Sequence, residues 1–183
     1  MAIFEFQSDV LNLKSDFPGA GIPSETIPSI LAVKRLNHYC QATMIRTAEP
    51  ADAAVIAELL DQLGYPTTAV EVPERLRRIR SEGHGEVFVS VVAGEVGGLV
   101  SVQVGPGLTR SEDTAYVSTL VVAEELRGKG VGRELLEVAE DYARKHECPR
   151  IVVATANHRN GAHAFYARLG WEWTGRRYAK VLG

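Results

Sequence analysis

The sequence predicts an α/β fold of the α+β type, in which a mixed, mostly antiparallel sheet contains one β-α-β crossover. Two β-branched runs in "EVFVSVVAGEVGGLVSVQVG" (residues 86–105) surround Gly94 and Glu95, which is typical of a β-hairpin. The strand-like run "AYVSTLVVA" (115–123) precedes an amphipathic helix at 131–146 and the apolar run "RIVVATA" (150–156). Two strands joined through a helix pair in parallel. With 183 residues, 45% of them hydrophobic, the chain can build one core of this kind.

The elements before the hairpin begin with a short strand at Ile45 and Arg46. A helix follows, with an apolar stripe that ends before Gly64 and consists of Val55, Ile56, Leu59, Leu60 and Leu63. The segment "VPERLRRIRSEG" (72–83) predicts a second helix. Its arginines favour a solvated face, with a surface for an acidic substrate as the alternative. After the crossover, "GAHAFYARLG" (161–170) predicts a short helix closed by a glycine, and "WEWTGRRYAKVL" (171–182) predicts two strands or a final hairpin.

Residues 44–183 are expected to form this domain, and residues 1–43 an N-terminal extension that is partly irregular. Residues 17–28 contain three prolines and two glycines, a composition that favours a loop. A short amphipathic helix is expected from residue 27 onward. Two hypotheses fit the extension: it is an appendage, or it is translated from a start upstream of the functional one. It shows no group of residues with an evident chemical role.

Composition argues against several classes of partner. There are 20 Lys and Arg against 23 Asp and Glu, a formal charge of -3, so we expect no nucleic-acid partner. No apolar run approaches ~18 residues and the N-terminus lacks a secretory pattern, so no membrane partner and a cytoplasmic location are expected. Cys40 and Cys148 are far apart and outside any metal-ligand spacing, which indicates reduced thiols and no metal site.

The stretch "LRGKGVGREL" (126–135) joins a predicted strand to a predicted helix and indicates anion binding. Gly128, Gly130 and Gly132 allow the backbone to wrap closely around a phosphate at the positive end of the helix dipole. Long-range attraction would come from the cations around them, Arg127, Lys129 and Arg133. A glycine helix cap is the structural alternative. The spacing fits neither a P-loop nor the dinucleotide GxGxxG pattern, although His158 and Arg159 leave an NADP hypothesis open.

The longer stretch "STLVVAEELRGKGVGRELLEVAEDYA" (118–143) resembles the acyl-CoA-binding motif of the GNAT superfamily of N-acetyltransferases. Arg127, Gly130 and Gly132 occupy the Arg/Gln-x-x-Gly-x-Gly/Ala positions of that motif. Downstream, "RNGAHAFYARLGW" (159–171) resembles the second signature of the family. The resemblance extends from Met44 to Leu182 and implies a GNAT-like sheet with splayed central parallel strands.

The resemblance implies that acetyl-CoA is the co-substrate and lies between the two diverging strands. Its pantetheine arm would pair with the main chain of Leu120, Val121 and Val122, and its pyrophosphate would bind the loop from Arg127 to Arg133, with Val131 at the helix start. Arg159 stands where relatives often have an asparagine, and could reach the CoA phosphates or an acidic acceptor.

The resemblance also implies direct attack of an amine on the thioester. Tyr166 matches the tyrosine that helps the thiolate leave, with packing against the sheet as the alternative role. Ser118 stands where many relatives have a catalytic glutamate, and could order a water instead. The proton of the incoming amine is then left to solvent or to one of four weaker candidates, Tyr116, His84, His163 and Glu124. His163 lies one helical turn before Tyr166, a position from which it could orient that hydroxyl.

The expected acceptor is a small primary amine such as an amino sugar, polyamine or amino acid. A protein N-terminus or lysine is the second choice, and a non-catalytic acyl-CoA-binding sensor is the competing class. The acceptor site is expected between Leu63 and Ser81 and on the final strands, where aromatic surface is offered by Tyr65, Trp171, Trp173 and Tyr178. A homodimer is compatible with this architecture, without an interface signature in the sequence.

Overall fold

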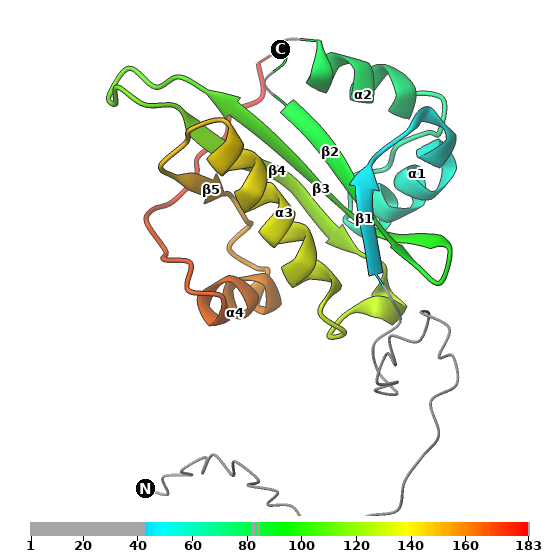
Figure 1. Cartoon of the computed structure of the whole chain (residues 1–183). Helices are drawn as coiled ribbons and strands as arrows, with labels where there is room; N and C mark the ends of the chain where they lie inside the picture. The colour runs from blue at the N-terminus through cyan, green and yellow to red at the C-terminus, as the bar shows by residue number, and fades with distance from the viewer. Residues whose placement is uncertain (1–42, 82, 84, 183) are drawn as a thin grey trace, which may run out of the picture. The chain divides into compact units, whose positions relative to one another are not determined.

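The fold is known from a computed structural model that describes residues 43–81, 83 and 85–182. Five strands form one sheet in the order β1-β2-β3-β4-β5 (Figure 1). Their bounds are Thr43–Thr47, Gly85–Val92, Glu95–Gly105, Thr114–Val122 and Ile151–Val153. The first four strands pair antiparallel and β4 pairs parallel with β5. The predicted mixed sheet with one crossover is therefore confirmed. The predicted extension lies outside the described residues, and its boundary at residue 43 stays a prediction.

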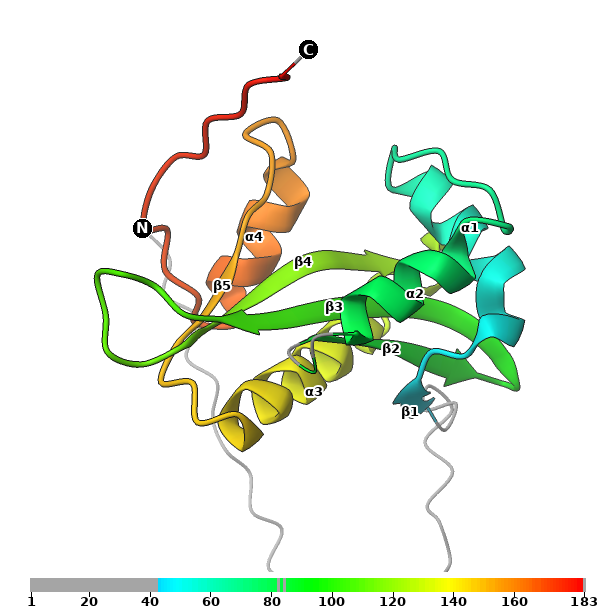
Figure 2. The ribbon, with the colours of Figure 1, turned by 90° about the horizontal axis from the view of Figure 1, so that it is seen from above.

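Four helices cover the two faces of this sheet. They are α1 (Ala53–Gln62), α2 (Val72–Arg80), α3 (Val131–Lys145) and α4 (Asn160–Arg168), with 3-10 turns η1 (Pro50–Asp52) and η2 (Glu124–Leu126). Figure 2 shows α3 alone beneath the sheet, and α1, α2 and α4 above it. The upper helices leave part of β4 between them, which is where the cavity described below is found.

The side chains pack into one apolar cluster on each face. Beneath the sheet, Leu135, Leu136 and Ala139 of α3 are at most 1% exposed and pack against the valines of β3. Above it, Leu59 of α1 and Val72 of α2 are 2% exposed and belong to the second cluster. The stripe predicted for α1 contains the buried Ile56 and Leu59, whereas the buried face of α3 is centred on Leu135, Leu136 and Ala139.

A β-bulge in β4 changes which side chains face each cluster. Ser101 of β3 pairs with Thr119, but the next residue of β3, Val102, pairs with Val117, so Ser118 is left over. Before the bulge, Val117 packs with α3; after it, Leu120 does so. An extra residue shifts the two-residue alternation by one. The bulge therefore places Thr119 and Val121 on the upper face, where α1 and α2 lie, and Leu120 and Val122 on the face of α3.

The pairing between β4 and β5 ends early. Only Ala115, Tyr116 and Val117 of β4 pair with β5, although β4 continues to Val122. Beyond the bulge, β5 ends and the chain turns toward α4, as Figures 1 and 2 show. Among the described residues, no strand pairs with the outer edge of β4 from Ser118 onward, which agrees with the expected splaying of the central parallel strands.

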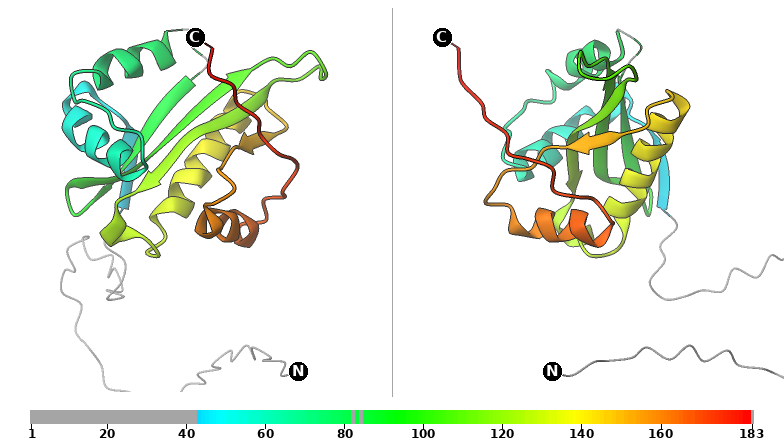
Figure 3. Two further views of the ribbon diagram at one scale, coloured as in Figure 1. Left: turned by 180° about the vertical axis from the view of Figure 1, so that it is seen from behind. Right: turned by 90° about the vertical axis from the view of Figure 1, so that its left-hand side faces the viewer.

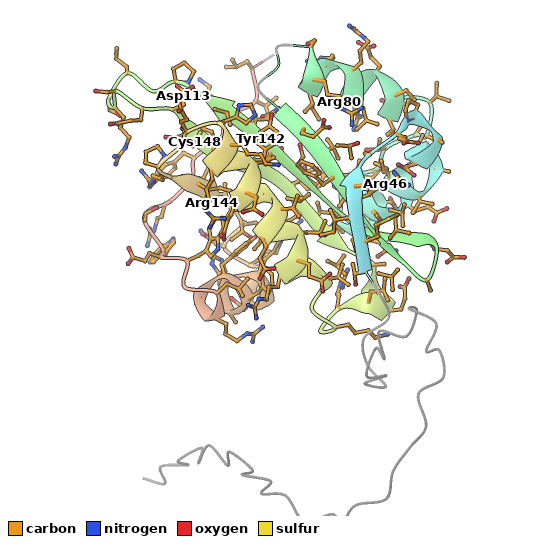
Figure 4. All side chains as sticks on the ribbon, viewed as in Figure 1. Arg46, Arg80, Asp113, Tyr142, Arg144 and Cys148 are labelled. Carbon is orange, nitrogen blue, oxygen red and sulfur yellow. The ribbon has the colours of Figure 1, made fainter. Side chains whose placement is uncertain are left out.

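Ion pairs connect the upper helices to the sheet. Arg46 on β1 donates to both carboxylate oxygens of Asp52 at 2.7 and 2.8 Å, and Asp52 also accepts from the Glu49 N–H at the start of η1. Arg80 at the end of α2 donates to Glu86 on β2 and to the Ala48 carbonyl. Figure 4 shows Arg46 and Arg80 on these elements. Both arginines hold the helices against the sheet rather than face solvent freely.

The prediction of two C-terminal strands was wrong. Residues 171–182 form neither helix nor strand, and Figure 3 shows this red segment as an extended trace that does not join the sheet. An alternating pattern specifies a strand only where a sheet edge is available for pairing. No helix among the described residues is long and apolar enough to cross a membrane.

Candidate active site

A cavity of about 750 Å³ lies on the upper face of the sheet, above β3 and β4. Its walls come from α1, α2 and the loop between them on one side, and from β5, α4 and the C-terminal segment on the other. Volumes of this size suit a small-molecule site. Four of the predicted site residues line it, namely Ser118, Leu120, Arg159 and Tyr166.

The predicted glycine loop lies at the start of α3 and shows the backbone geometry that an anion site needs. Gly128 and Gly130 have φ angles of +77° and +94°, and a β-carbon at either position would meet no atom within 4 Å. Gly130 is the N-cap of α3, and its carbonyl accepts from the N–H groups of Arg133 and Glu134. The N–H groups of Val131 and Gly132 precede the first intrahelical bond, so they are free to bind a ligand.

Gly132 has a packing role instead of a turn role. A β-carbon there would lie 3.3 Å from the ring of Phe165, on α4. The absence of that carbon lets α4 approach the N-terminus of α3. Since Phe165 is followed by Tyr166, this contact fixes the distance between the glycine loop and the cavity wall.

The three loop cations are exposed side chains with different partners. Arg127 donates to the Val122 carbonyl at 3.2 Å, and Arg133 pairs with Glu137 one turn further along α3. Lys129 is exposed. Exposed pairs of this kind are weak and exchange readily for a stronger anion. Val121 and Val122 behave as β4 core residues, so any contact they make with a ligand would come from their main chain.

Tyr166 is half buried between α4 and the cavity. Its ring packs against Phe165 and Trp171, with centroid distances of 5.3 and 5.6 Å. Burial raises the pKa of Tyr166 to about 12, while the positive charge of Arg159 acts in the opposite direction. At neutral pH the hydroxyl therefore keeps its proton and can donate a hydrogen bond.

Ser118 is the bulged residue of β4 and lines the cavity floor. Its hydroxyl lies 3.5 Å from the Ser101 carbonyl, a long contact that leaves it available to water or substrate. Three of the four weaker base candidates, Tyr116, Glu124 and His163, are not among the described residues that line the cavity, and His163 contacts the Ala156 carbonyl. The fourth, His84, lies outside the described residues. Among the described residues, no hydrogen bond joins His163 to Tyr166, and the orienting role of His163 stays a prediction.

Arg159 crosses from the start of α4 to the end of α1. Its guanidinium donates to the Leu63 carbonyl at 2.7 Å and lines the cavity beside Tyr166. Of the two roles left open for Arg159, the position on the cavity wall favours contact with an acceptor, because the glycine loop is not among the residues that line this cavity.

The structure shows which arginines line the cavity. For the arginines of residues 72–83 the sequence favoured a solvated face and left a surface for an acidic substrate as the alternative; Arg75, about half exposed, lines the cavity and donates to Thr67. Arg177 lines it as well, from the segment expected to be a strand. Of the predicted aromatic surface, Tyr65 lines the cavity, whereas Trp173 and Tyr178 are 74% and 88% exposed and do not. Only the three-dimensional arrangement of α1, α2 and the C-terminal segment could show this.

Metal chemistry has no evident ligand set here. The part of the chain that the structure describes contains no group of three or more His, Cys, Asp or Glu side chains able to hold a metal ion. Cys148 is buried near the end of α3, and burial raises the pKa of its thiol. Figure 4 shows it near Tyr142; it belongs to the apolar cluster that contains α3 and is not among the residues that line the cavity.

The parallel strands that separate, the glycine-rich start of α3 and a tyrosine beside the gap form the arrangement that the resemblance to acyl-transferring enzymes led us to expect. The sequence matches the Acetyltransferase (GNAT) family over residues 53–171, which is more than half of the chain. The chain belongs to this family of acetyltransferases.

Individual relatives agree with this assignment. An aminoalkylphosphonate N-acetyltransferase of Salmonella typhimurium is 33% identical over 89 residues, which are 49% of this chain and 58% of that enzyme. An uncharacterized N-acetyltransferase of Bacillus subtilis, YhfO, is 30% identical over 134 residues, which are 70% of this chain and 89% of the relative. The crystal structure of glucosamine-6-phosphate N-acetyltransferase from Arabidopsis thaliana has a TM-score of 0.67 at 22% identity, over 78% of this chain and 99% of that one, and so shares the fold.

Proposed function

We propose that the protein transfers the acetyl group of acetyl-CoA to the nitrogen of a small primary amine. The observation that carries this proposal is the cavity of about 750 Å³ that contains Tyr166 and borders the unpaired edge of β4. Membership of the GNAT family, which uses acetyl-CoA, and similarity to a relative named for its action on aminoalkylphosphonates support it.

The residues present fit acetyl-CoA. The backbone N–H groups at Val131 and Gly132 would bind the pyrophosphate, with Arg127, Lys129 and Arg133 around it. The open side of Gly128 and Gly130 leaves room for phosphate oxygens. The unpaired edge of β4 around Leu120 would accept the pantetheine amides as an added strand does. Acetyl-CoA supplies the thioester that the amine attacks.

The chemistry then requires no enzyme nucleophile. The lone pair of the amine attacks the thioester carbonyl, the C–N bond forms, and the C–S bond breaks with its electrons left on sulfur. The Tyr166 hydroxyl donates a hydrogen bond to the departing sulfur, which takes up a proton to give the free thiol of CoA. The ammonium product of attack loses a proton to solvent, and Ser118 orders the water that receives it.

A thermal melt of the full chain with acetyl-CoA, and in parallel with NADP, tests the cofactor. At ~100 times its dissociation constant a ligand stabilises the fold by about 2.7 kcal/mol, which raises Tm by roughly 5–10 °C for a domain of this size. Stabilisation by acetyl-CoA alone, followed by thiol release with an amine, would support the proposal. Stabilisation by NADP alone would refute it.

A matched pair of variants assigns the binding to the glycine loop. Gly130→Ala and Gly94→Ala each place a side chain at a φ above +90° with no atom within 4 Å, so backbone strain lowers the two unliganded Tm values alike. Only Gly130→Ala, at the start of α3, should also reduce the shift with acetyl-CoA. Equal shifts in both variants would place the pyrophosphate elsewhere. Binding without thiol release for any amine would instead indicate the sensor class.

A further inference from the structure

The described charged side chains that line the cavity are all arginines. Arg75 on α2, Arg159 at the start of α4 and Arg177 in the C-terminal segment reach it from three separate elements. Among its described lining residues there is no aspartate, glutamate or histidine. The described cavity wall therefore contains three cationic side chains and no acidic one.

The three arginines differ in how far their charge is balanced. Arg75 pairs with Glu71 at 3.3 Å, and both side chains are about half exposed, so its charge is partly compensated at the rim. Arg159 donates to a neutral acceptor, the Leu63 carbonyl. Within residues 43–81, 83 and 85–182, neither Arg159 nor Arg177 forms an ion pair with a carboxylate. Uncompensated charge at these two positions is available to a ligand.

A buried hydroxyl in the cavity wall gives a second, independent indication of a polar ligand. Ser101 is 3% exposed, and its side-chain oxygen has no hydrogen-bond partner among the described residues. Buried polar atoms are almost always paired. Because Ser101 lines the cavity, a ligand oxygen can provide the missing partner.

On the basis of the proposed acetyl transfer, we infer that the acceptor is a small primary amine that also carries an anionic oxyacid group, namely a phosphate, phosphonate or carboxylate. Arg159 and Arg177 bind the oxyanion, since the planar guanidinium matches the oxygens of these groups in two parallel hydrogen bonds. Polyamines and other acceptors with a second ammonium group are disfavoured, because no acidic side chain of the described cavity would bind that group.

The same charge favours the reactive form of the amine. A nearby positive charge disfavours protonation, so it lowers the pKa of an ammonium group beside it. The bound amine then loses its proton more easily, although the described cavity offers no carboxylate or imidazole to remove it. The arginines thus serve both recognition of the acid group and deprotonation of the amine.

Matched acceptors test the inference with the full chain and saturating acetyl-CoA. Release of CoA thiol would be followed with O-phosphoethanolamine against ethanolamine, 3-aminopropylphosphonate against 3-amino-1-propanol, and β-alanine against its amide. We expect kcat/KM to be about 10- to 100-fold higher for at least one anionic acceptor than for its neutral partner, because hydrogen bonds to charged groups are strong. Comparison of the three pairs shows which oxyacid is preferred.

Two neighbouring arginines provide the variant and its control. Arg177→Ala removes an exposed side chain from an irregular segment, so the fold should be retained, and the ratio of anionic to neutral kcat/KM should fall at least fivefold. Arg176→Ala removes a neighbouring arginine that is also exposed but does not line the cavity, and should leave the ratio unchanged. Arg159→Lys keeps the charge but not the planar guanidinium, and should also lower the ratio.

The inference is overturned if neutral and anionic acceptors react alike, or if Arg176→Ala and Arg177→Ala have the same effect. Failure of acetyl transfer itself would look different, with no thiol released for any amine. In that case, melts with acetyl-CoA and 1-propylphosphonate or 1-propanol report on the cavity directly. Stabilisation by the phosphonate alone would support the anion site, and no difference between the two would refute it.

Discussion

At the scale of single residues, Tyr166 has the position and protonation state that a thiolate-stabilising donor needs. Burial raises the pKa of Tyr166 to about 12, so below pH 11 the hydroxyl is almost entirely protonated. We expect Tyr166→Phe to lower kcat about 10- to 100-fold, with the thermal shift by acetyl-CoA unchanged, since the interaction forms as sulfur departs. Steady-state thiol release and thermal melts would measure the two effects.

Tyr142 provides the control for that substitution. It is a partly buried tyrosine on α3 whose ring packs against Phe88 and His146 on the opposite face of the sheet, and burial raises its pKa as well. Tyr142→Phe should therefore leave kcat within about twofold. Equal losses in the two variants would mean that Tyr166 acts through packing alone.

The sequence indicated some site residues because each of them lies in a local pattern. The glycine loop joins a strand to a helix, and Tyr166 lies in a short helical signature, so both are recognisable from neighbouring residues. Arg177 carries no such local signal, and Arg75 is one of four arginines on a helix whose role the sequence left open between a solvated face and a surface for an acidic substrate. Arg75 and Arg177 reach one cavity only after α2 and residues 171–182 are placed in space, and Ser118 is distinguished by a bulge that the amino-acid pattern does not encode.

At the scale of elements, the attachment of α1 to the sheet depends on the Arg46–Asp52 pair. Arg46 lowers the pKa of Asp52, so this contribution to stability is complete above the usual pKa of an aspartate and is lost as pH falls through the lower, folded value. Asp52→Asn should cost about 2 kcal/mol at pH 7, which is roughly 4–8 °C in Tm. Thermal melts between pH 7 and pH 2 would show the difference from wild type shrink below pH ~4.

Asp61 on the same helix is the matched control. Its side chain is exposed and makes no ion pair within the described residues. Asp61→Asn should change stability by less than about 0.5 kcal/mol at any of these pH values. If Asp52→Asn behaves like Asp61→Asn, η1 and α1 are held by apolar packing alone.

Secondary structure was predictable wherever an element is specified by its own periodicity. The amphipathic stripes of α1 and α3 and the hairpin around Gly94 satisfied that condition. Residues 171–182 did not, because a strand depends on a partner that the sequence cannot supply. The outer strand β5 has only the three residues Ile151–Val153, so it offers a short edge to a further strand.

At the scale of the whole molecule, the distribution of charge determines how the reaction depends on pH. The described cavity wall contains arginines and hydroxyls but no carboxylate or imidazole, so the amine is expected to lose its proton to solvent. The rate at low pH then follows the fraction of unprotonated amine, and log(kcat/KM) should rise by about one per pH unit up to the pKa of the free amine. A lysine-like amine with pKa ~10.4 and an α-amino group with pKa ~7.7–8.0 should therefore give inflections more than two pH units apart.

The dependence of kcat on pH separates the effect of the arginines on the pKa of the bound amine from the loss of the amine proton to solvent. It reports ionisations in the enzyme–substrate complex, so its inflection should lie below that of kcat/KM, because the cavity arginines lower the pKa of the bound ammonium. Arg177→Ala should move the kcat inflection upward and leave the kcat/KM inflection in place. An inflection that stays at one pH for every amine would instead identify an ionising group of the enzyme as the base, and the charge of the cavity would then act in recognition alone.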